Sequence, residues 1–314
     1  MLRHVGKIST SLGTVIPRCR TNVPKRSCVE ACILDWSGTV SDKYVIAPAI
    51  AFQQVFSDYG IEVSMEEARV PMGLRKDLHI KKMLLGNNRI SEMWSAKYGY
   101  TPTLHDVGKL FEDFVPIQLH ALHEHAALIP DVNQTIQYLR VGMGIKVGST
   151  TGFTREMVEV LETAANKQGA YFDTTVAGDE VSNGARPAPH MVYKNMDNLG
   201  IDSPIGVVKV DDTVGGIGEG LSAGCWTVGV SRFSNYMDID SLEHERELTH
   251  IELDDRNQKT RVILAEAGAH YVIDTVNELP RVINDINNKL KNGVVPSLDE
   301  ETVILDDNLS MPLL

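Results

Sequence analysis

Residues 29–42 read VEACILDWSGTVSD. The first six are mostly apolar, which is the length and character of a buried strand, and they stop abruptly at Asp35. The loop that follows contains Ser37, Gly38 and Ser41, residue types that favour turns. This stretch predicts a buried strand that delivers an aspartate to a loop at its carboxyl end.

Similar segments recur along the chain. Apolar runs of strand length occupy 144–148, 206–210, 226–230 and 269–273. Helical patterns lie between them, at 155–168, 191–199 and 279–290. Strands that alternate with helices predict an α/β fold with a Rossmann-like, doubly wound parallel sheet. In such a sheet the ligand binds beyond the carboxyl ends of the strands.

Residues 47–126 have a different character, because they show helical periodicity and no clear strand. The candidate helices are 47–59, 64–70, 75–85, 90–98 and 104–122. We predict that this segment is a helical cap domain inserted into the core. The predicted division is 1–27 an N-terminal extension, 28–46 and 127–286 the two parts of the core, 47–126 the cap, and 287–314 an irregular C-terminal tail.

Composition limits the class of protein. The 314 residues are 43 % hydrophobic and 23 % charged, typical of a globular chain with one large domain or two smaller ones. No stretch of about 18 residues is apolar throughout, so no membrane span is expected. A net charge of −12 argues against nucleic acid as the partner.

The N-terminus differs in charge from the rest. The first 29 residues contain six basic residues and no acid, a composition similar to that of a mitochondrial transit peptide. The alternative is a basic extension with no targeting role on a cytoplasmic protein. Four cysteines without a CxxC pair fit a reducing, intracellular compartment in either case.

The polar residues at the predicted strand ends suggest phosphoryl chemistry. Asp35, Thr151 and Asp212 each follow a predicted strand and should meet at one edge of the sheet. An aspartate there can attack phosphorus and form an aspartyl phosphate. Asp212 can be a second carboxylate for Mg²⁺, and Thr151 and Arg186 can bind the phosphoryl oxygens.

These segments resemble the four motifs of the haloacid dehalogenase-like hydrolase superfamily, in order: DWSGT at 35–39, STTG at 149–152, Arg186, and VDD at 210–212. Three longer stretches narrow the resemblance: EEARVPMGLRK at 66–76, GSTTGFTREM at 148–157 and AGCWTVGV at 223–230. They are similar to the phosphonoacetaldehyde hydrolase (phosphonatase) family, over residues 28–286.

The resemblance implies a small-molecule phosphonate substrate and a role for each matching residue. Lys76 would form a Schiff base with the aldehyde of phosphonoacetaldehyde, and Asp35 would attack phosphorus. Met72 and His79 would line the substrate pocket. Thr151, Gly152 and Arg186 would bind the phosphate group.

The family also implies a cofactor and an assembly. Asp35, Asp212 and the main-chain carbonyl of Ser37 would hold Mg²⁺. Two copies of the chain would form a homodimer through their caps. Ester phosphatases of the superfamily usually carry a second Asp at the position of Ser37, where it protonates the leaving oxygen; C–P cleavage has no such oxygen.

Three positions depart from the family pattern. The fourth motif usually has a glycine where this chain has Asp211, and an acid where it has Gly216. Loss of that acid predicts weaker Mg²⁺ binding. Phe153 stands where tyrosine is common. Two alternatives therefore stay open: a phosphatase acting on a phosphate ester, and a degenerate family member without catalytic activity.

Several of these residues also have ordinary interpretations. Asp35 could be a turn aspartate and Lys76 a solvated lysine. The histidines at 120, 123 and 125 suggest a metal site, but no partner is spaced to complete it, so we interpret them as an exposed helix end. GGIGEG at 215–220 lacks the spacing of a dinucleotide-binding loop, so we expect it to be the loop and helix after the fourth motif.

Overall fold

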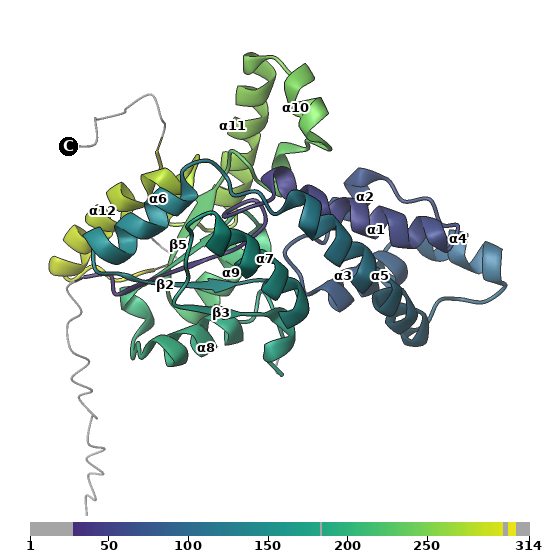
Figure 1. The fold of residues 1–314 in the computed structure, drawn as a ribbon, viewed down its shortest axis with the longest axis horizontal. Helices are drawn as coiled ribbons and strands as arrows, with labels where there is room; N and C mark the ends of the chain where they lie inside the picture. Colours follow the sequence, from purple (N-terminus) through teal and green to yellow (C-terminus); the bar gives the residue numbers. More distant parts are fainter. Residues whose placement is uncertain (1–27, 183, 298–300, 306–314) are drawn as a thin grey trace, which may run out of the picture.

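The computed structural model describes residues 28–182, 184–297 and 301–305. Its centre is a parallel seven-stranded sheet in the order β3-β2-β1-β4-β5-β6-β7 (Figure 1). The strands are β1 Ala31–Leu34, β2 Lys146–Thr150, β3 Thr174–Val176, β4 Val207–Asp211, β5 Trp226–Val230, β6 Tyr271–Ile273 and β7 Val303–Ile304. The predicted α/β fold with a doubly wound parallel sheet is confirmed.

Side chains alternate between the two faces along each strand, and both faces are apolar. Helices therefore cover both faces of the sheet. Cys32 and Leu34 of β1 join a core cluster with α6, α7 and α12, whereas Ala31 and Ile33 pack with α8. The core helices are α6 Val132–Gln137, α7 Arg155–Lys167, α8 His190–Leu199, α9 Val214–Ala223, α10 Leu242–Glu247, α11 His250–Glu266 and α12 Leu279–Lys291.

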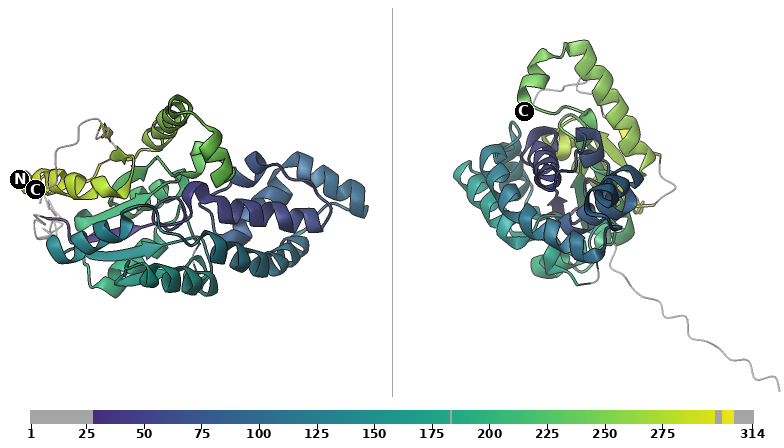
Figure 2. Two further views of the ribbon diagram at one scale, coloured as in Figure 1. Left: turned by 45° about the horizontal axis from the view of Figure 1, so that its top comes forward. Right: turned by 90° about the vertical axis from the view of Figure 1, so that its right-hand side faces the viewer.

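Five helices between β1 and β2 extend away from the sheet, as Figure 1 and the left view of Figure 2 show. They are α1 Ile46–Asp58, α2 Met65–Arg69, α3 Lys76–Gly86, α4 Asn88–Tyr98 and α5 Leu104–His125. Helix α5 contacts both α1 and α3, α2 contacts α1, and α4 contacts α3. The five predicted helices of this segment are each present, with ends shifted by up to three residues.

The expected strands are also present, and the differences lie at short elements. The run at 226–230 matches β5, and the others begin one or two residues later than predicted. The three-residue β3 was not predicted, because so short a polar segment has no periodicity to detect.

The prediction of an irregular chain from residue 287 is wrong for two segments. Helix α12 continues to Lys291 and buries Leu290 against the core. Residues Val303–Ile304 then add β7 to the edge of the sheet beside β6. The helical pattern at 279–290 predicts α12 to within one residue of its end, whereas the two-residue β7 is too short to be detected from the sequence.

Two sequence predictions concern other parts of the chain. The predicted extension at 1–27, with its targeting role, lies outside the described residues. Within the described residues, none of the helices has both the length and the apolar character needed to cross a membrane.

Candidate active site

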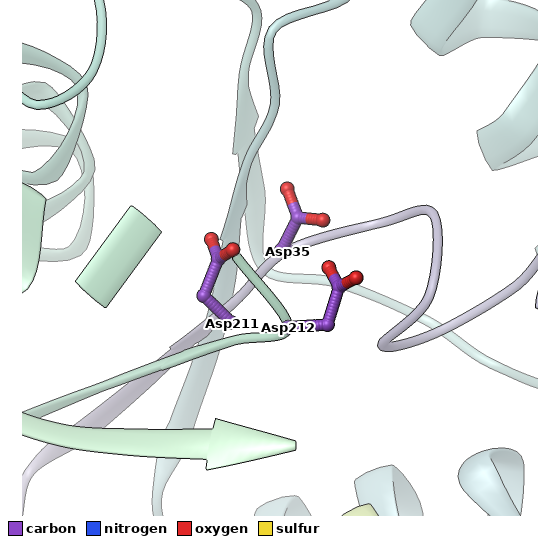
Figure 3. A group of neighbouring side chains, drawn as sticks. All are labelled: Asp35, Asp211 and Asp212. Atoms are coloured by element: carbon purple, nitrogen blue, oxygen red, sulfur yellow. The ribbon is translucent and has the colours of Figure 1, made fainter. Parts of the chain in front are cut away.

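Three carboxylates meet where β1 and β4 end. Asp35 directly follows β1, Asp211 ends β4, and Asp212 is the next residue. The two strands are paired in parallel, with Leu34 opposite Val210, which brings the three side chains together. Their ligand atoms lie within 4.8 Å of one another and point to the same side of the strand ends (Figure 3).

Arg186 forms ion pairs with two of these carboxylates from a loop before α8. Its Nη2 lies 2.6 Å from Asp35 Oδ1 and 3.3 Å from Asp211 Oδ2, and its Nε lies 3.0 Å from Glu219 Oε2. The same Nη2 donates to the carbonyl of Thr150 at 2.8 Å. We call Asp35, Arg186, Asp211 and Asp212 the charged end of the site. These contacts fix the guanidinium beside the predicted nucleophile.

The carboxylates differ in how far neighbouring charges and hydrogen bonds offset the effect of burial on their pKa values. Burial raises the pKa of Asp35 to about 6, although Arg186 opposes the shift. Burial, followed by the charges of Asp35 and Asp211, raises the pKa of Asp212 well above its usual range. Asp212 Oδ2 accepts from the Asn235 backbone N–H at 3.0 Å, but Oδ1 is buried with no hydrogen-bond partner. An orphaned carboxylate oxygen beside a second carboxylate suits a hard divalent cation.

A lysine approaches the charged end from the helical segment. Lys76 is the first residue of α3, and its backbone N–H donates to the Gly152 carbonyl at 3.3 Å. The two loops are so close that a Cβ on Gly152 would lie 2.4 Å from the Leu74 carbonyl oxygen. Glycine at 152 is therefore what allows the loop before α3 to reach the sheet.

The amine of Lys76 is buried among rings. Its side chain is 4 % exposed, and Nζ lies 4.3 Å from the ring centroid of Phe153 and 5.7 Å from that of Phe52. The interpretation of Lys76 as a solvated lysine is therefore wrong. Burial lowers the pKa of Lys76 to about 8, although the charge of Asp35 opposes the shift.

His79 lies one turn further along α3 and is fully buried. Its ring stacks on Phe52 with centroids 3.7 Å apart, and its Nε2 lies 2.9 Å from the Ala68 carbonyl oxygen. Burial, with the charge of Lys76, holds the pKa of His79 well below its usual range. We call Lys76, His79, Phe52 and Phe153 the amine end of the site.

One small cavity joins the two ends. Seven of the nine predicted site residues line it: Asp35, Ser37, Met72, Lys76, Thr151, Gly152 and Arg186. The other two lie behind the lining. Asp212 belongs to the carboxylate cluster, and His79 is covered by Phe52. The structure therefore brings together residues from the loops after β1, β2 and β4, from α3 and the loop before it, and from the loop before α8.

Three participants were not predicted from the sequence: Lys209, Glu219 and Phe52. Lys209 is buried on β4, with Nζ 2.7 Å from Asp211 Oδ2 and 3.7 Å from Glu219 Oε2. A lysine inside an otherwise apolar strand was the available signal, since such a charge needs a buried partner. Glu219 and Phe52 have no such signal, because only the folded chain brings them to the site.

The remaining predictions concern stretches outside this site. His120 is exposed and pairs with Glu124 at 3.6 Å near the end of α5. Among the residues that the structure describes, only the Asp35, Asp211 and Asp212 group has metal-ligand spacing. The glycine-rich stretch at 215–220 forms the first turns of α9, as predicted.

Comparison with known proteins gives the same family as the motifs. The family model for haloacid dehalogenase-like hydrolases matches residues 32–230. A phosphonoacetaldehyde hydrolase of Pseudomonas fluorescens is 40 % identical over 268 residues, which cover 85 % of this chain and 96 % of the relative.

Two further matches extend the comparison. A bifunctional phosphonoacetaldehyde hydrolase/aminoethylphosphonate transaminase of Clostridioides difficile is 39 % identical over 86 % of this chain, which spans only 42 % of that relative's length. The crystal structure of a phosphonoacetaldehyde hydrolase-like protein from Oleispira antarctica superposes with a TM-score of 0.81 at 41 % identity, covering 85 % of this chain and 96 % of the other. The chain therefore belongs to the haloacid dehalogenase-like hydrolases and, within them, to the phosphonoacetaldehyde hydrolase family.

Proposed function

We propose that this protein hydrolyses the C–P bond of phosphonoacetaldehyde, giving acetaldehyde and phosphate. The observation that carries the proposal is a buried amine, Lys76, on the same cavity as the Asp35–Arg186 pair. Hydrolysis of a phosphate ester needs no imine and therefore no nucleophilic amine. The relatives named phosphonoacetaldehyde hydrolase, at about 40 % identity over most of the chain, support the same substrate.

Lys76 acts first. With a pKa of about 8, about a tenth of the amine is neutral at pH 7, far more than for an exposed lysine. The neutral amine attacks the aldehyde carbon, water leaves, and a protonated imine remains. This cation is an electron sink two atoms from phosphorus, and a bare carbanion would be a far poorer leaving group.

His79 would exchange protons with Lys76 during these steps. The Ala68 carbonyl can only accept a hydrogen bond, so the contact at 2.9 Å assigns the ring proton to Nε2. Nδ1 is then the unprotonated nitrogen, and it is buried without a partner. The lowered pKa keeps the ring neutral at pH 7, as a proton acceptor beside a lysine requires.

Asp35 then attacks phosphorus. One carboxylate oxygen forms the new O–P bond while the C–P bond breaks. The electron pair of the C–P bond moves into the imine and gives an enamine. Arg186 offsets the charge of the transferring group, and Thr151 and Gly152 bind its oxygens from the loop after β2. Protonation of the enamine carbon and hydrolysis of the imine release acetaldehyde, and water hydrolyses the aspartyl phosphate to phosphate.

The carboxylates of Asp35 and Asp212, with the main-chain carbonyl of Ser37, would hold Mg²⁺. The unpartnered Asp212 Oδ1 and the oxygen-only donor set fit this ion. When bound, Mg²⁺ would neutralise charge on the phosphoryl oxygens. Ser37 also supports the proposal in another way, since no acid at this position is available to protonate the leaving oxygen of an ester.

We also propose a division of the chain and an assembly from the family resemblance. Residues 47–126 would be the cap, and 28–46 with 127–286 the core; the mutual packing of α1 to α5 supports this division. Two copies would pair through their caps. Light scattering on a size-exclusion column would test the assembly, and a mass of one chain at micromolar concentration would exclude it.

Release of acetaldehyde tests the function. Purified protein is supplied with phosphonoacetaldehyde and Mg²⁺, and an alcohol dehydrogenase reports the product. We expect turnover that disappears in Lys76→Ala and persists in Lys81→Ala, a control that removes an exposed lysine from the same helix. Borohydride added with substrate should reduce the imine and add the two-carbon adduct to Lys76, as seen by mass spectrometry.

The alternatives give different results. An ester phosphatase would release phosphate from esters, would survive Lys76→Ala and would not be inactivated by borohydride with substrate. A non-catalytic family member would turn over neither phosphonates nor phosphate esters with Mg²⁺. Either outcome would reject the proposed function.

A further inference from the structure

Arg69, the last residue of α2, is a buried arginine that the proposed chemistry does not use. Its Nη1 donates to the Tyr44 carbonyl at 2.7 Å, to the Asn235 carbonyl at 3.3 Å and to Asn235 Oδ1 at 3.2 Å. Its Nη2 donates to the Ile239 carbonyl at 2.6 Å. These acceptors belong to buried residues of two loops, so the guanidinium joins the loop before α1 to the loop after β5.

The contacts between α2 and the loop after β5 run in both directions. Asn235 Nδ2 donates to the Arg69 carbonyl at 3.4 Å, and Asp240 Oδ1 lies 3.5 Å from Arg69 Nε. Asn235 is only 3 % exposed, so water cannot replace these contacts. Arg69 and Asn235 therefore hold each other through both their side chains and their main chains.

The same loop also holds the proposed metal ligand Asp212. The Asn235 backbone N–H donates to Asp212 Oδ2 at 3.0 Å, and Ser234 Oγ donates to the Asp212 carbonyl at 2.8 Å. The Val214 N–H donates to the Tyr236 hydroxyl at 3.1 Å. These bonds fix the carboxylate with Oδ2 occupied, which leaves the unpartnered Oδ1 as the oxygen for a cation.

We propose that Arg69 is a positioning residue for Asp212 and acts through Asn235. Arg69 holds Asn235 where its backbone N–H orients the Asp212 carboxylate, so α2 sets the geometry of a ligand that follows the sheet. The helical segment then contributes to both ends of the cavity, directly with Lys76 and through this relay with Asp212. The inference deepens the function proposed above and rests on it for the metal that Asp212 would hold.

Two variants break the relay at different points. Arg69→Met keeps most of the side-chain volume and removes the donors. Asn235→Ala removes the side-chain contacts with Arg69 but keeps the N–H that bonds Asp212, and it carries the test if Arg69→Met does not fold. Each should weaken Mg²⁺ binding about tenfold, measured by calorimetry on the full chain. Arg69→Lys keeps the charge and one donor group, so it should recover part of the loss.

Hydrogen exchange gives a second readout that needs neither metal nor turnover. The Asn235 amide is bonded to Asp212, so it should exchange slowly in the native chain and about tenfold faster in Arg69→Met, while β4 and β5 stay protected. Arg140→Met is the matched control, because Arg140 pairs with Asp173 at 2.6 Å beside the start of β2, at the other end of the sheet. This variant should lower the melting temperature and change neither readout.

Native Mg²⁺ affinity in both Arg69→Met and Asn235→Ala would overturn the proposal. So would an equal loss of affinity in Arg140→Met, since a general loss of stability would then explain the effect. If the native chain binds no Mg²⁺, the proposed metal site fails, and exchange at Asn235 decides the relay, which slow exchange in Arg69→Met would reject. An inactive native chain that shows the expected differences would reject the proposed function and leave the relay in place.

Discussion

The two ends of the active-site cavity shift the pKa of a buried cation in opposite directions. At the charged end, Arg186 touches the carboxylates of Asp35, Asp211 and Glu219 at 2.6 to 3.3 Å. These neighbours outweigh its burial, and they raise the pKa of the guanidinium above its usual range. At the amine end, Lys76 faces the rings of Phe153 and Phe52, and burial lowers its pKa to about 8.

This difference matches two kinds of chemistry. A group that binds a phosphoryl anion must keep its charge through every step, which ion pairing ensures. An amine that attacks an aldehyde must lose its proton first, which desolvation favours. The helical segment and the sheet thus contribute different electrostatic environments to one cavity, although the charge of Asp35 also acts on Lys76.

The largest expected effect separates the two ends. Asp35→Asn removes the nucleophile, so acetaldehyde release should fall about 10⁴-fold or more. The amine end is intact in this variant, so borohydride should still trap the substrate on Lys76 at a rate within severalfold of the native one. Quenched-flow and mass spectrometry measure the two rates, with Lys76→Ala as the reciprocal control. Equal loss of trapping and turnover would show that the two ends do not act independently.

Sequence patterns predicted the parts of this site that depend on local order. Asp35, Thr151 and Asp212 each follow a buried strand, and a parallel sheet brings such residues to one edge whatever the rest of the chain does. Lys76 came from the resemblance of its surrounding sequence to one family, since a lysine at a helix start is by itself unremarkable. The strands before these three residues are apolar runs of strand length, which the sequence shows directly.

The contacts that surround His79 and Arg186 could not be predicted from the sequence. Phe52, which covers His79, comes from a helix 27 residues upstream of it, and Glu219 reaches Arg186 from a different helix. No periodicity encodes such pairs, because they depend on how elements pack. The departures at 211 and 216 pointed to a weakened metal site, and only the structure shows that the Asp211 carboxylate occupies the space beside Gly216.

A second effect, of medium size, concerns stability. Burying Lys76 as a cation opposes folding, so Lys76→Met should raise the free energy of unfolding at pH 7 by about 2–3 kcal/mol and the melting temperature by about 5 °C. The folded pKa, about 8, lies below the unfolded value of 10.5. The penalty is therefore complete below pH 8 and disappears as the pH rises through 10.5, where the native chain and the variant should converge.

Thermal unfolding across pH 7 to 11 checks this expectation. Lys81→Met is the control, because Lys81 is exposed on the same helix and should change stability by no more than about 0.5 kcal/mol at any pH. A Lys76→Met variant no more stable than the native chain at pH 7 would show that the buried amine carries no electrostatic cost. The difference drawn above between the two ends would then fail at the amine end.

The smallest effect tests what the rings contribute. Phe153 both excludes water from Lys76, which lowers the pKa of the amine, and attracts its cation, which raises that pKa. Leucine keeps the first effect and loses the second, so Phe153→Leu should lower the pKa of Lys76 by about half a unit. Because imine formation needs the neutral amine, trapping by borohydride rises with pH, and its midpoint should move from about 8 in the native chain to a lower pH.

Phe153→Tyr keeps the ring and should leave the midpoint in place. A midpoint that rises in Phe153→Leu would mean that the ring acts mainly by excluding water, and that the amine end is tuned by burial alone.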